Sequence, residues 1–148
     1  MTVRSRAERI ADARRRLAFD PNVWIATASP DGVPHVVPLS LAWIDEAIVV
    51  TTPTDTPTVR NALATGRARA CLDSASDVVV IDGAITGVDL QAARAELLDA
   101  YVERVGWDPR DDADAWTLLT LAPRRVQAWN GVAEMSGRTL MRDGVWTA

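Results

Sequence analysis

The 148-residue sequence contains no lysine, and it has only one histidine, one cysteine, one phenylalanine and one tyrosine. Without lysine, the chain has no side-chain amine for Schiff-base chemistry. Cys71 cannot form a disulfide within the chain, and a single His with a single Cys cannot build a His/Cys cage for a metal. The acidic run at 108–114 lacks the glycine-centred loop of an EF-hand. We therefore expect no metal site.

Long apolar runs are also missing. None approaches the roughly 20 residues that a membrane-spanning helix needs, and the charged residues 1–16 do not have the apolar stretch of a signal peptide. The net charge of −4 and the pI near 4.9 argue against nucleic acid as the main partner, because phosphate binding needs a basic face. We expect a cytoplasmic protein that binds neither nucleic acid nor a membrane.

The composition is that of a globular protein. Hydrophobic residues make up 48% and charged residues 24% of the chain, and the length is typical of one domain of roughly 100–150 residues. All 16 basic residues are arginine, which suggests a GC-rich genome. They are unevenly spread, since residues 1–20 and 116–148 are net positive and residues 21–115 net negative. We expect a single domain over residues 1–148.

Capping signals predict three helices. Each begins after a residue whose side chain can accept a hydrogen bond from the first helical turn. Glycine at 66 and 106 is expected to end the second and third helices. The predicted helices lie within 1–20, capped by Ser5 with Glu8, at 57–65, capped by Thr56 with Pro57 at the first helical position, and at 90–105, capped by Asp89.

Period-2 alternation and turn residues predict short antiparallel strands. Gly83 is expected to mark a bulge, and Asp143-Gly144 a turn within a C-terminal hairpin tail at 134–148. Short turns between many short strands predict a small antiparallel barrel decorated with helices. The predicted strands are 23–28, 35–43 and 47–52, which form a three-strand meander, followed by 67–72, 77–86, 116–121 and 125–129.

The segment from Thr51 to Asn61 is the strongest candidate for a binding site. It brings Thr51, Thr52, Thr56 and Thr58, a helix start and Arg60 into one strand–loop–helix unit. Helix N-termini attract anions, and a guanidinium can bind a phosphate with two hydrogen bonds. A phosphate-bearing ligand fits there. In the alternative interpretation the threonines are strand and capping residues and Arg60 is a solvated helix residue.

His35 is the only histidine, and it lies within a predicted strand. It is either a hydrogen-bond donor to a ligand or a structural residue, and no nucleophile partner is apparent. The six tryptophans are expected to be core or subunit-interface anchors.

Four motifs in order identify a resemblance. They are GVPHVVPLS at 32–40, IVVTT at 48–52, TPTVRN at 56–61 and GRAR at 66–69, with GRTLMRDGVW closing the chain at 137–146. The chain resembles the pyridoxamine-phosphate-oxidase-like family of FMN-binding split β-barrels, and within it the actinobacterial branch of coenzyme F-420-dependent oxidoreductases. The resemblance implies a mainly β fold, an antiparallel split β-barrel with two or three peripheral helices. It also implies a homodimer with the cofactor at the interface.

Carried over by position, the resemblance places a cofactor against two parts of the chain. The ring system would lie along 35–38, the ribityl-phosphate region beside 51–52, and the phosphate at the start of the helix. The implied cofactor-binding residues are His35, Val36, Val37, Pro38, Thr51, Thr52, Thr56, Thr58, Arg60 and Asn61. Many relatives carry a lysine where Thr58 stands, and its loss removes a charge-assisted contact of about 1.5–3 kcal/mol.

The resemblance implies a flavin- or deazaflavin-dependent oxidoreductase. Coenzyme F-420 is the first choice of cofactor and FMN the second. The expected reaction is hydride transfer from reduced F-420 to a small electron-poor acceptor, with the cofactor carrying the hydride and no catalytic acid or base assigned. The alternatives are an FMN-binding oxidoreductase of the same family and a non-catalytic flavin- or haem-type binding protein.

Overall fold

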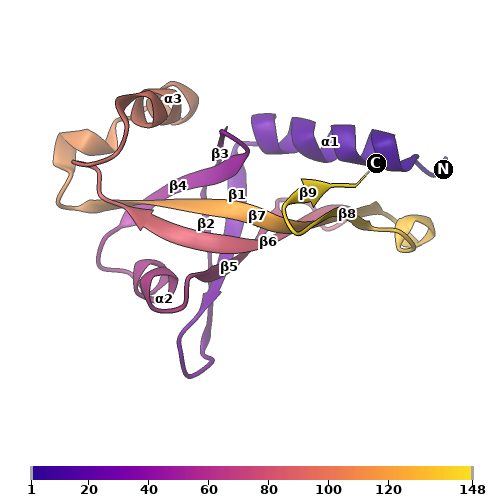
Figure 1. Ribbon diagram of the computed structural model, residues 1–148, viewed down its shortest axis with the longest axis horizontal. Helices are drawn as coiled ribbons and strands as arrows, with labels where there is room; N and C mark the ends of the chain where they lie inside the picture. Colours follow the sequence, from indigo (N-terminus) through magenta and orange to yellow (C-terminus); the bar gives the residue numbers. More distant parts are fainter. Residues whose placement is uncertain (1, 148) are drawn as a thin grey trace.

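The computed structural model describes residues 2–147, which form one curved antiparallel sheet and three α-helices (Figure 1). The main sheet order is β2-β1-β5-β6-β7-β4-β3, and the C-terminal hairpin of β8 and β9 pairs with β7. The strands are β1 (Asn22–Ala28), β2 (Pro34–Ser40), β3 (Ala42–Ile44), β4 (Ala47–Pro53), β5 (Arg67–Leu72), β6 (Asp77–Val88), β7 (Trp116–Asn130), β8 (Thr139–Arg142) and β9 (Val145–Trp146).

The two ends of the sheet order are consecutive in the chain. Only Leu41 separates β2 from β3, yet β2 pairs with β1 and β3 pairs with β4. The sheet therefore curls into a half-barrel, as the predicted split-barrel class requires. The prediction of one unbroken strand at 35–43 is wrong, because the chain turns at Leu41. That residue is buried, and its N–H donates to the carbonyl of Pro21 at 2.9 Å.

A bulge interrupts the pairing between the two longest strands, β6 and β7. The register between β6 and β7 shifts at Asp82/Gly83, as predicted for Gly83. A Cβ at Gly83 would lie 2.2 Å from the carbonyl oxygen of Ala122, so only glycine permits this approach. The prediction of two separate strands at 116–121 and 125–129 is wrong. Pro123, which lacks an N–H, lies at the bulge, where its missing donor is tolerated and the ladder resumes.

The helices α1 (Arg6–Phe19) and α2 (Pro57–Thr65) form where the capping signals predicted them. In α1, the Ser5 side chain accepts from the Glu8 N–H and the Glu8 carboxylate accepts from the Ser5 N–H. The third helix, α3 (Ala95–Val105), begins five residues later than predicted. Asp89 caps a turn instead, where its carboxylate accepts from the N–H of Gln91.

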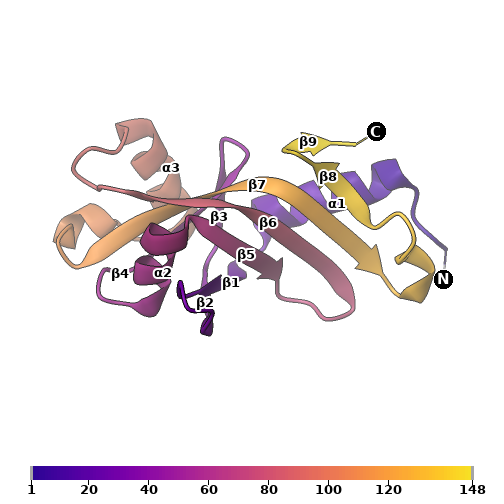
Figure 2. The same cartoon turned by 60° about the horizontal axis from the view of Figure 1, so that its bottom comes forward.

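The core has two parts. The larger cluster fills the half-barrel, and a smaller one packs beneath α3 around Leu98, Tyr101 and Leu118. In Figure 1, α1 and α3 lie above the sheet and α2 lies below β6, and Figure 2 shows α2 beside the ends of β4 and β6. Within residues 2–147, no helix is long and apolar enough to cross a membrane.

The predicted C-terminal hairpin is present. Asp143 and Gly144 have φ angles of 50° and 80°, which suits a tight turn between β8 and β9.

Candidate functional site

Helix α2 begins at the end of β4, as the predicted strand–loop–helix unit requires. The Thr56 hydroxyl accepts from the Val59 N–H at 3.4 Å, and Pro57 has no N–H to offer. Of the donors in the first helical turn, this leaves the N–H of Thr58 for a ligand. The start of α2 is therefore a weak anion site by itself.

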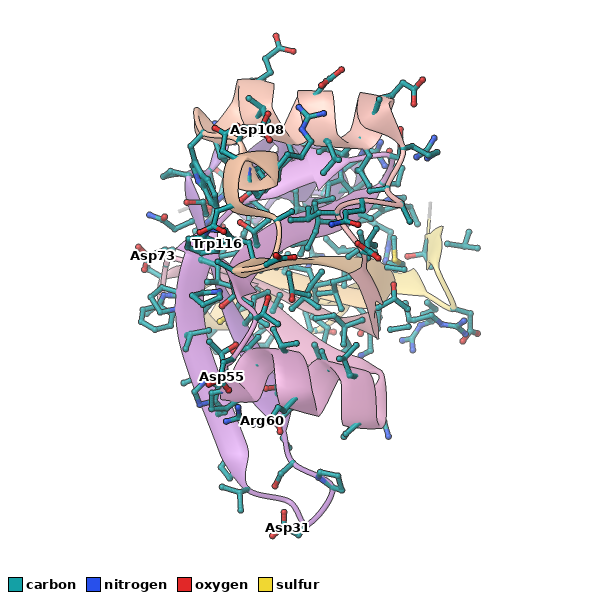
Figure 3. The ribbon with its side chains drawn as sticks, turned by 90° about the vertical axis from the view of Figure 1, so that its left-hand side faces the viewer. Asp31, Asp55, Arg60, Asp73, Asp108 and Trp116 are labelled. Atoms are coloured by element: carbon teal, nitrogen blue, oxygen red, sulfur yellow. The ribbon has the colours of Figure 1, made fainter. Side chains whose placement is uncertain are left out.

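The charged group at this corner is held by a neighbour. The Arg60 guanidinium donates to the Asp55 carboxylate at 2.9 Å, and both side chains are exposed, at 60% and 100% (Figure 3). Exposed pairs of this kind stabilise little, about 0–1 kcal/mol. An incoming phosphate would therefore easily replace the Asp55 carboxylate as the partner of the Arg60 guanidinium.

Thr58 and Asn61 lie on the buried face of α2. Thr58 is 1% exposed, and the Asn61 amide donates to the Thr27 hydroxyl on β1 at 3.2 Å. These two predicted phosphate ligands are therefore turned towards the half-barrel in this structure. The visible role of Asn61 is to fasten α2 to β1.

Thr51 and Thr52 are both buried, and as consecutive strand residues they face opposite sides of β4. The Thr51 hydroxyl lies 2.6 Å from the Tyr101 hydroxyl beneath α3. Burial raises the pKa of Tyr101, which keeps the phenol protonated. The side chains of Thr51 and Thr52 are thus separated by the sheet.

Strand β2 divides the predicted ring-binding segment in the same way. Val36 and Pro38 are exposed on the outer face, whereas His35 and Val37 face inward and are half-buried. His35 is paired with Thr27 of β1, so it lies beside the Thr27–Asn61 hydrogen bond. Its Nε2 atom is buried and has no hydrogen-bond partner among residues 2–147. Buried polar atoms without a partner are rare and point to a missing group.

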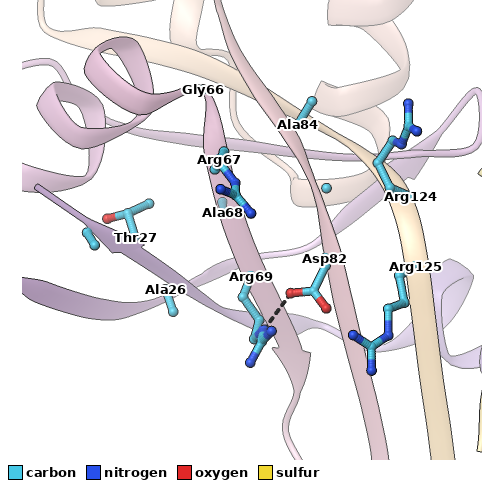
Figure 4. A pocket seen from close by; sticks show the side chains of 12 residues that line it. Ala26, Thr27, Gly66, Arg67, Ala68, Arg69, Asp82, Ala84, Arg124 and Arg125 are labelled. Carbon is cyan, nitrogen blue, oxygen red and sulfur yellow. Dashed lines mark hydrogen bonds and ion pairs between the residues drawn. The ribbon is translucent and has the colours of Figure 1, made fainter. Parts of the chain in front are cut away.

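A groove of about 740 Å³ lies on the outer face of the sheet (Figure 4). Its floor is made of small residues from β1, β5 and β6. Its walls carry four arginines, Arg67 and Arg69 from β5 and Arg124 and Arg125 from β7, together with one acid, Asp82. Val36 is paired with Ala26 at the rim of this groove, so the outer half of the predicted ring-binding segment is continuous with it.

Comparison with known proteins identifies the fold and the family. Residues 10–130 match the family described as pyridoxamine 5'-phosphate oxidase. The chain belongs to that family. No protein of curated function matches it.

Solved structures with a fold similar to that of this chain include proteins named for different ligands. A structure titled F420 Reductase is 21% identical, with 76% of this chain and 94% of that chain covered and a TM-score of 0.61. A heme binding protein from Mycobacterium smegmatis is 20% identical, with 97% and 60% covered and a TM-score of 0.69. A pyridoxamine 5'-phosphate oxidase-related, FMN binding protein from Nostoc punctiforme is 17% identical, with 93% and 88% covered and a TM-score of 0.62. At these identities the likeness shows the fold alone.

In this member of the pyridoxamine 5'-phosphate oxidase family, the tertiary structure divides the predicted site. Arg60, Thr56, Val36 and Pro38 are accessible, whereas Thr51, Thr52, Thr58 and Asn61 are buried. Residues 35–38 and α2 meet through Thr27, which the sequence analysis did not single out. Thr27 could have been identified only from the pairing register of β1 and β2, which the sequence does not give.

The groove arginines were also missed as a site. Arg67 and Arg69 carry a readable signal, since alternate strand residues share a face. The sequence does not predict that Arg124 and Arg125 share a face, because consecutive strand residues normally face opposite sides. Here the bulge leaves both side chains exposed.

Proposed function

We propose that this protein is an oxidoreductase that binds a flavin-type cofactor, coenzyme F-420 as first choice or FMN as second, in the corner between β2 and α2. The observation that carries the proposal is the buried, partnerless Nε2 of His35 within the predicted site. A ring system with polar edges would give that atom its hydrogen bond. Family membership supports the oxidoreductase class.

The residues of the chain would divide the work of holding such a ligand. Arg60, released from Asp55, binds the phosphate together with the Thr58 N–H. His35 offers a hydrogen bond on the inner face of β2, and Val36 and Pro38 offer an apolar surface on its outer face, so the ligand would lie over the free edge of this terminal strand. Asn61, through Thr27, keeps α2 and the β1–β2 hairpin at a fixed separation. Val37, Thr51, Thr52 and Thr56 complete the proposed set.

The chemistry is that of the cofactor. When bound, it supplies hydride transfer between its ring and a small electron-poor acceptor. The chain binds and orients both molecules, and we assign no catalytic acid or base. F-420 is preferred to FMN because of the motif resemblance to the F-420-dependent branch.

We further propose that two copies of the chain form a homodimer. The outer face near β2 exposes Val33, Val36 and Trp24 at 59%, 55% and 37%. Clustered apolar side chains of this kind mark interaction surfaces. A second copy over this face would enclose the proposed cofactor and exclude water from it.

Titration with F-420 and, separately, with FMN tests the proposal through cofactor and tryptophan fluorescence. We expect micromolar or tighter binding of F-420, weaker binding of FMN, and a loss of at least about tenfold in Arg60→Ala. Arg94→Ala is the matched control, because Arg94 is an exposed arginine paired with Asp45 at 3.2 Å. Failure of both cofactors to bind would rule out the function, and unchanged binding in Arg60→Ala would rule out the site.

A non-catalytic haem-type binder is the second candidate, favoured by the fold shared with the mycobacterial heme binding protein. Haem would be held through a side chain that can ligate iron; Tyr101 is buried against Thr51, so His35 would be the residue that holds it. A Soret band that appears with added haemin and is lost in His35→Ala would favour this candidate.

A further inference from the structure

A second cleft, of about 370 Å³, lies where β6 ends and β7 begins, beside α2. Figure 3 shows Trp116, at the start of β7, between α2 and the segment that carries α3. A volume of this size is at the lower end of the range for small-molecule sites. None of the residues that line this cleft lines the outer-face groove or belongs to the proposed cofactor-binding set. The cleft is therefore a separate candidate site.

The charged side chains of the cleft are all acidic. Asp89 and Asp114 line it, and no arginine or histidine does. The Asp89 carboxylate accepts one hydrogen bond, from the N–H of Gln91 at 2.9 Å. Neither carboxylate has an ion-pair partner within residues 2–147. Two carboxylates that share one cleft without a cation favour a positively charged ligand there.

The arginines nearest to the cleft in the sequence are engaged elsewhere. Arg94 donates to Asp45 at 3.2 Å. Arg110 donates to Asp99 at 2.9 Å, across to α3. The Arg104 guanidinium donates to two backbone carbonyls at the end of α1. The basic residues of the segment that carries α3 therefore leave the two carboxylates of the cleft without a counter-charge.

The cleft also has an apolar wall. Leu63 of α2 is 67% exposed, and it lines the cleft together with Leu90 and Trp116. The Trp116 ring packs against Trp107 with 4.8 Å between their centroids, which holds it in place. A Trp ring binds hydrocarbon through its large area and attracts cations through its face. The wall suits a ligand that is apolar as well as positively charged.

The free edge of β6 adds backbone hydrogen-bonding groups. Strand β5 pairs with β6 only as far as Ala84, and beyond it the Ile85 N–H donates to the carbonyl of Gly66 instead. Alternate strand residues direct their N–H and C=O groups to the same edge, so those of Gly87 lie on the edge that no strand pairs with. Gly87 lines the cleft, and a Cβ there would lie 2.9 Å from the end of the Leu63 side chain. Glycine thus keeps this edge open, with its carbonyl as an acceptor for a ligand.

We propose that this cleft binds a small molecule that carries an ammonium or guanidinium group on an apolar body. The cation pairs with Asp89 and Asp114 and donates to the carbonyl of Gly87. The apolar body packs on Leu63 and Trp116. The same two carboxylates repel phosphate-bearing molecules, which distinguishes this cleft from the proposed phosphate site at the start of α2.

Calorimetric titration of the purified protein with n-hexylamine, and with n-hexanol as the uncharged control, tests the site without any redox cofactor. We expect saturable binding of hexylamine in the millimolar range or tighter, which weakens with added salt, and binding of hexanol at least about tenfold weaker. Asp89→Asn/Asp114→Asn should weaken the binding of hexylamine at least about tenfold. Asp111→Asn/Asp112→Asn is the matched control, because it removes the same charge from exposed residues outside the cleft. Leu63→Ala should weaken binding several-fold through loss of apolar contact.

Three results would overturn the proposal. One is the absence of saturable hexylamine binding in the millimolar range at low salt. Another is equal weakening in the cleft and control variants, which would show only a net-charge effect. The third is equal affinity for hexylamine and hexanol, which would show that the carboxylates take no part. None of these results depends on whether F-420 or FMN binds in the corner between β2 and α2.

Discussion

Arg4 of the N-terminal segment and Arg67 of the outer-face groove are the same residue type in opposite electrostatic surroundings. Arg4 donates to Glu134 and Asp12 and also lies 3.3 Å from Asp77. Arg67, at the start of β5, has no ion-pair partner within residues 2–147. Both segments are rich in arginine, but of these two residues only Arg67 keeps a charge that no carboxylate neutralises within residues 2–147.

The difference lies in which elements meet. Glu134 follows β7 in the sequence, 130 residues from Arg4, and is 2% exposed. Its carboxylate accepts from the Arg4 side chain, the Arg4 N–H and the Asn130 N–H. The groove strands bring one acid to four arginines. Charge counted along the sequence therefore does not show where free charge lies in the fold.

The largest effect is expected from the bulge that shapes the groove. In Gly83→Ala, the added Cβ would meet the backbone oxygen of Ala122 at 2.2 Å, so we expect a loss of about 3 kcal/mol or more in the free energy of unfolding. Gly87→Ala on the same strand is the control, because its Cβ meets only the ends of side chains, Leu63 at 2.9 Å and Leu119 at 3.9 Å. Urea unfolding of the two variants measures the contrast, and equal losses would show that the bulge is not constrained by Ala122.

Removal of Arg4 should destabilise the fold, because Arg4 neutralises a buried carboxylate in the N-terminal region. In Arg4→Ala, the buried Glu134 keeps its backbone donors but loses its charged partner, so we expect a loss of about 2–3 kcal/mol in the free energy of unfolding, measured in urea at pH 7. A loss below about 0.5 kcal/mol would mean that the pair contributes no more than an exposed ion pair.

The pH dependence should identify Glu134 as the cause. The side-chain hydrogen bond from Arg4 lowers the pKa of Glu134 from its usual 4.5 to about 2. A lowered carboxyl pKa stabilises the fold above pH 4.5, and this stability is lost as the pH falls from 4.5 towards 2. The difference between wild type and Arg4→Ala should shrink over that window, and a difference that is constant with pH would exclude Glu134.

The smallest effect is expected at the groove itself. Arg67→Ala removes a charge that has no ion-pair partner and relieves its repulsion by the other groove arginines. The free energy of unfolding should change by no more than about 0.5 kcal/mol. A large loss in urea unfolding would show that Arg67 has a structural role like that of Arg4, and the comparison would fail.

Local signals in the sequence predicted much of the fold because their physics is local. The Ser5–Glu8 capping box, the Thr56–Pro57 helix start and the Asp143–Gly144 turn each depend on residues within four positions of one another. The two errors in the strands occur where distant strands decide, whereas the late start of α3 is local, because Asp89 caps a turn instead of the helix. The ladder with β6 carries β7 through Pro123, and the pairing of β3 with β4 breaks the strand at Leu41.

The candidate site shows the same limit. Sequence placed Arg60 at a helix start, and the structure has it there. That Thr58 and Asn61 face inward depends on how α2 packs on the half-barrel, and neighbouring residues do not encode this.

The sequence by itself determined the caps of α1 and α2, the alternating strands and the bulge glycine. Only the tertiary structure decided which charges are neutralised, which threonines are buried and which arginines share one face of the sheet. Capping and alternation depend on neighbours in the chain, whereas charge pairing and burial depend on strand register and curvature, which bring together residues more than a hundred positions apart.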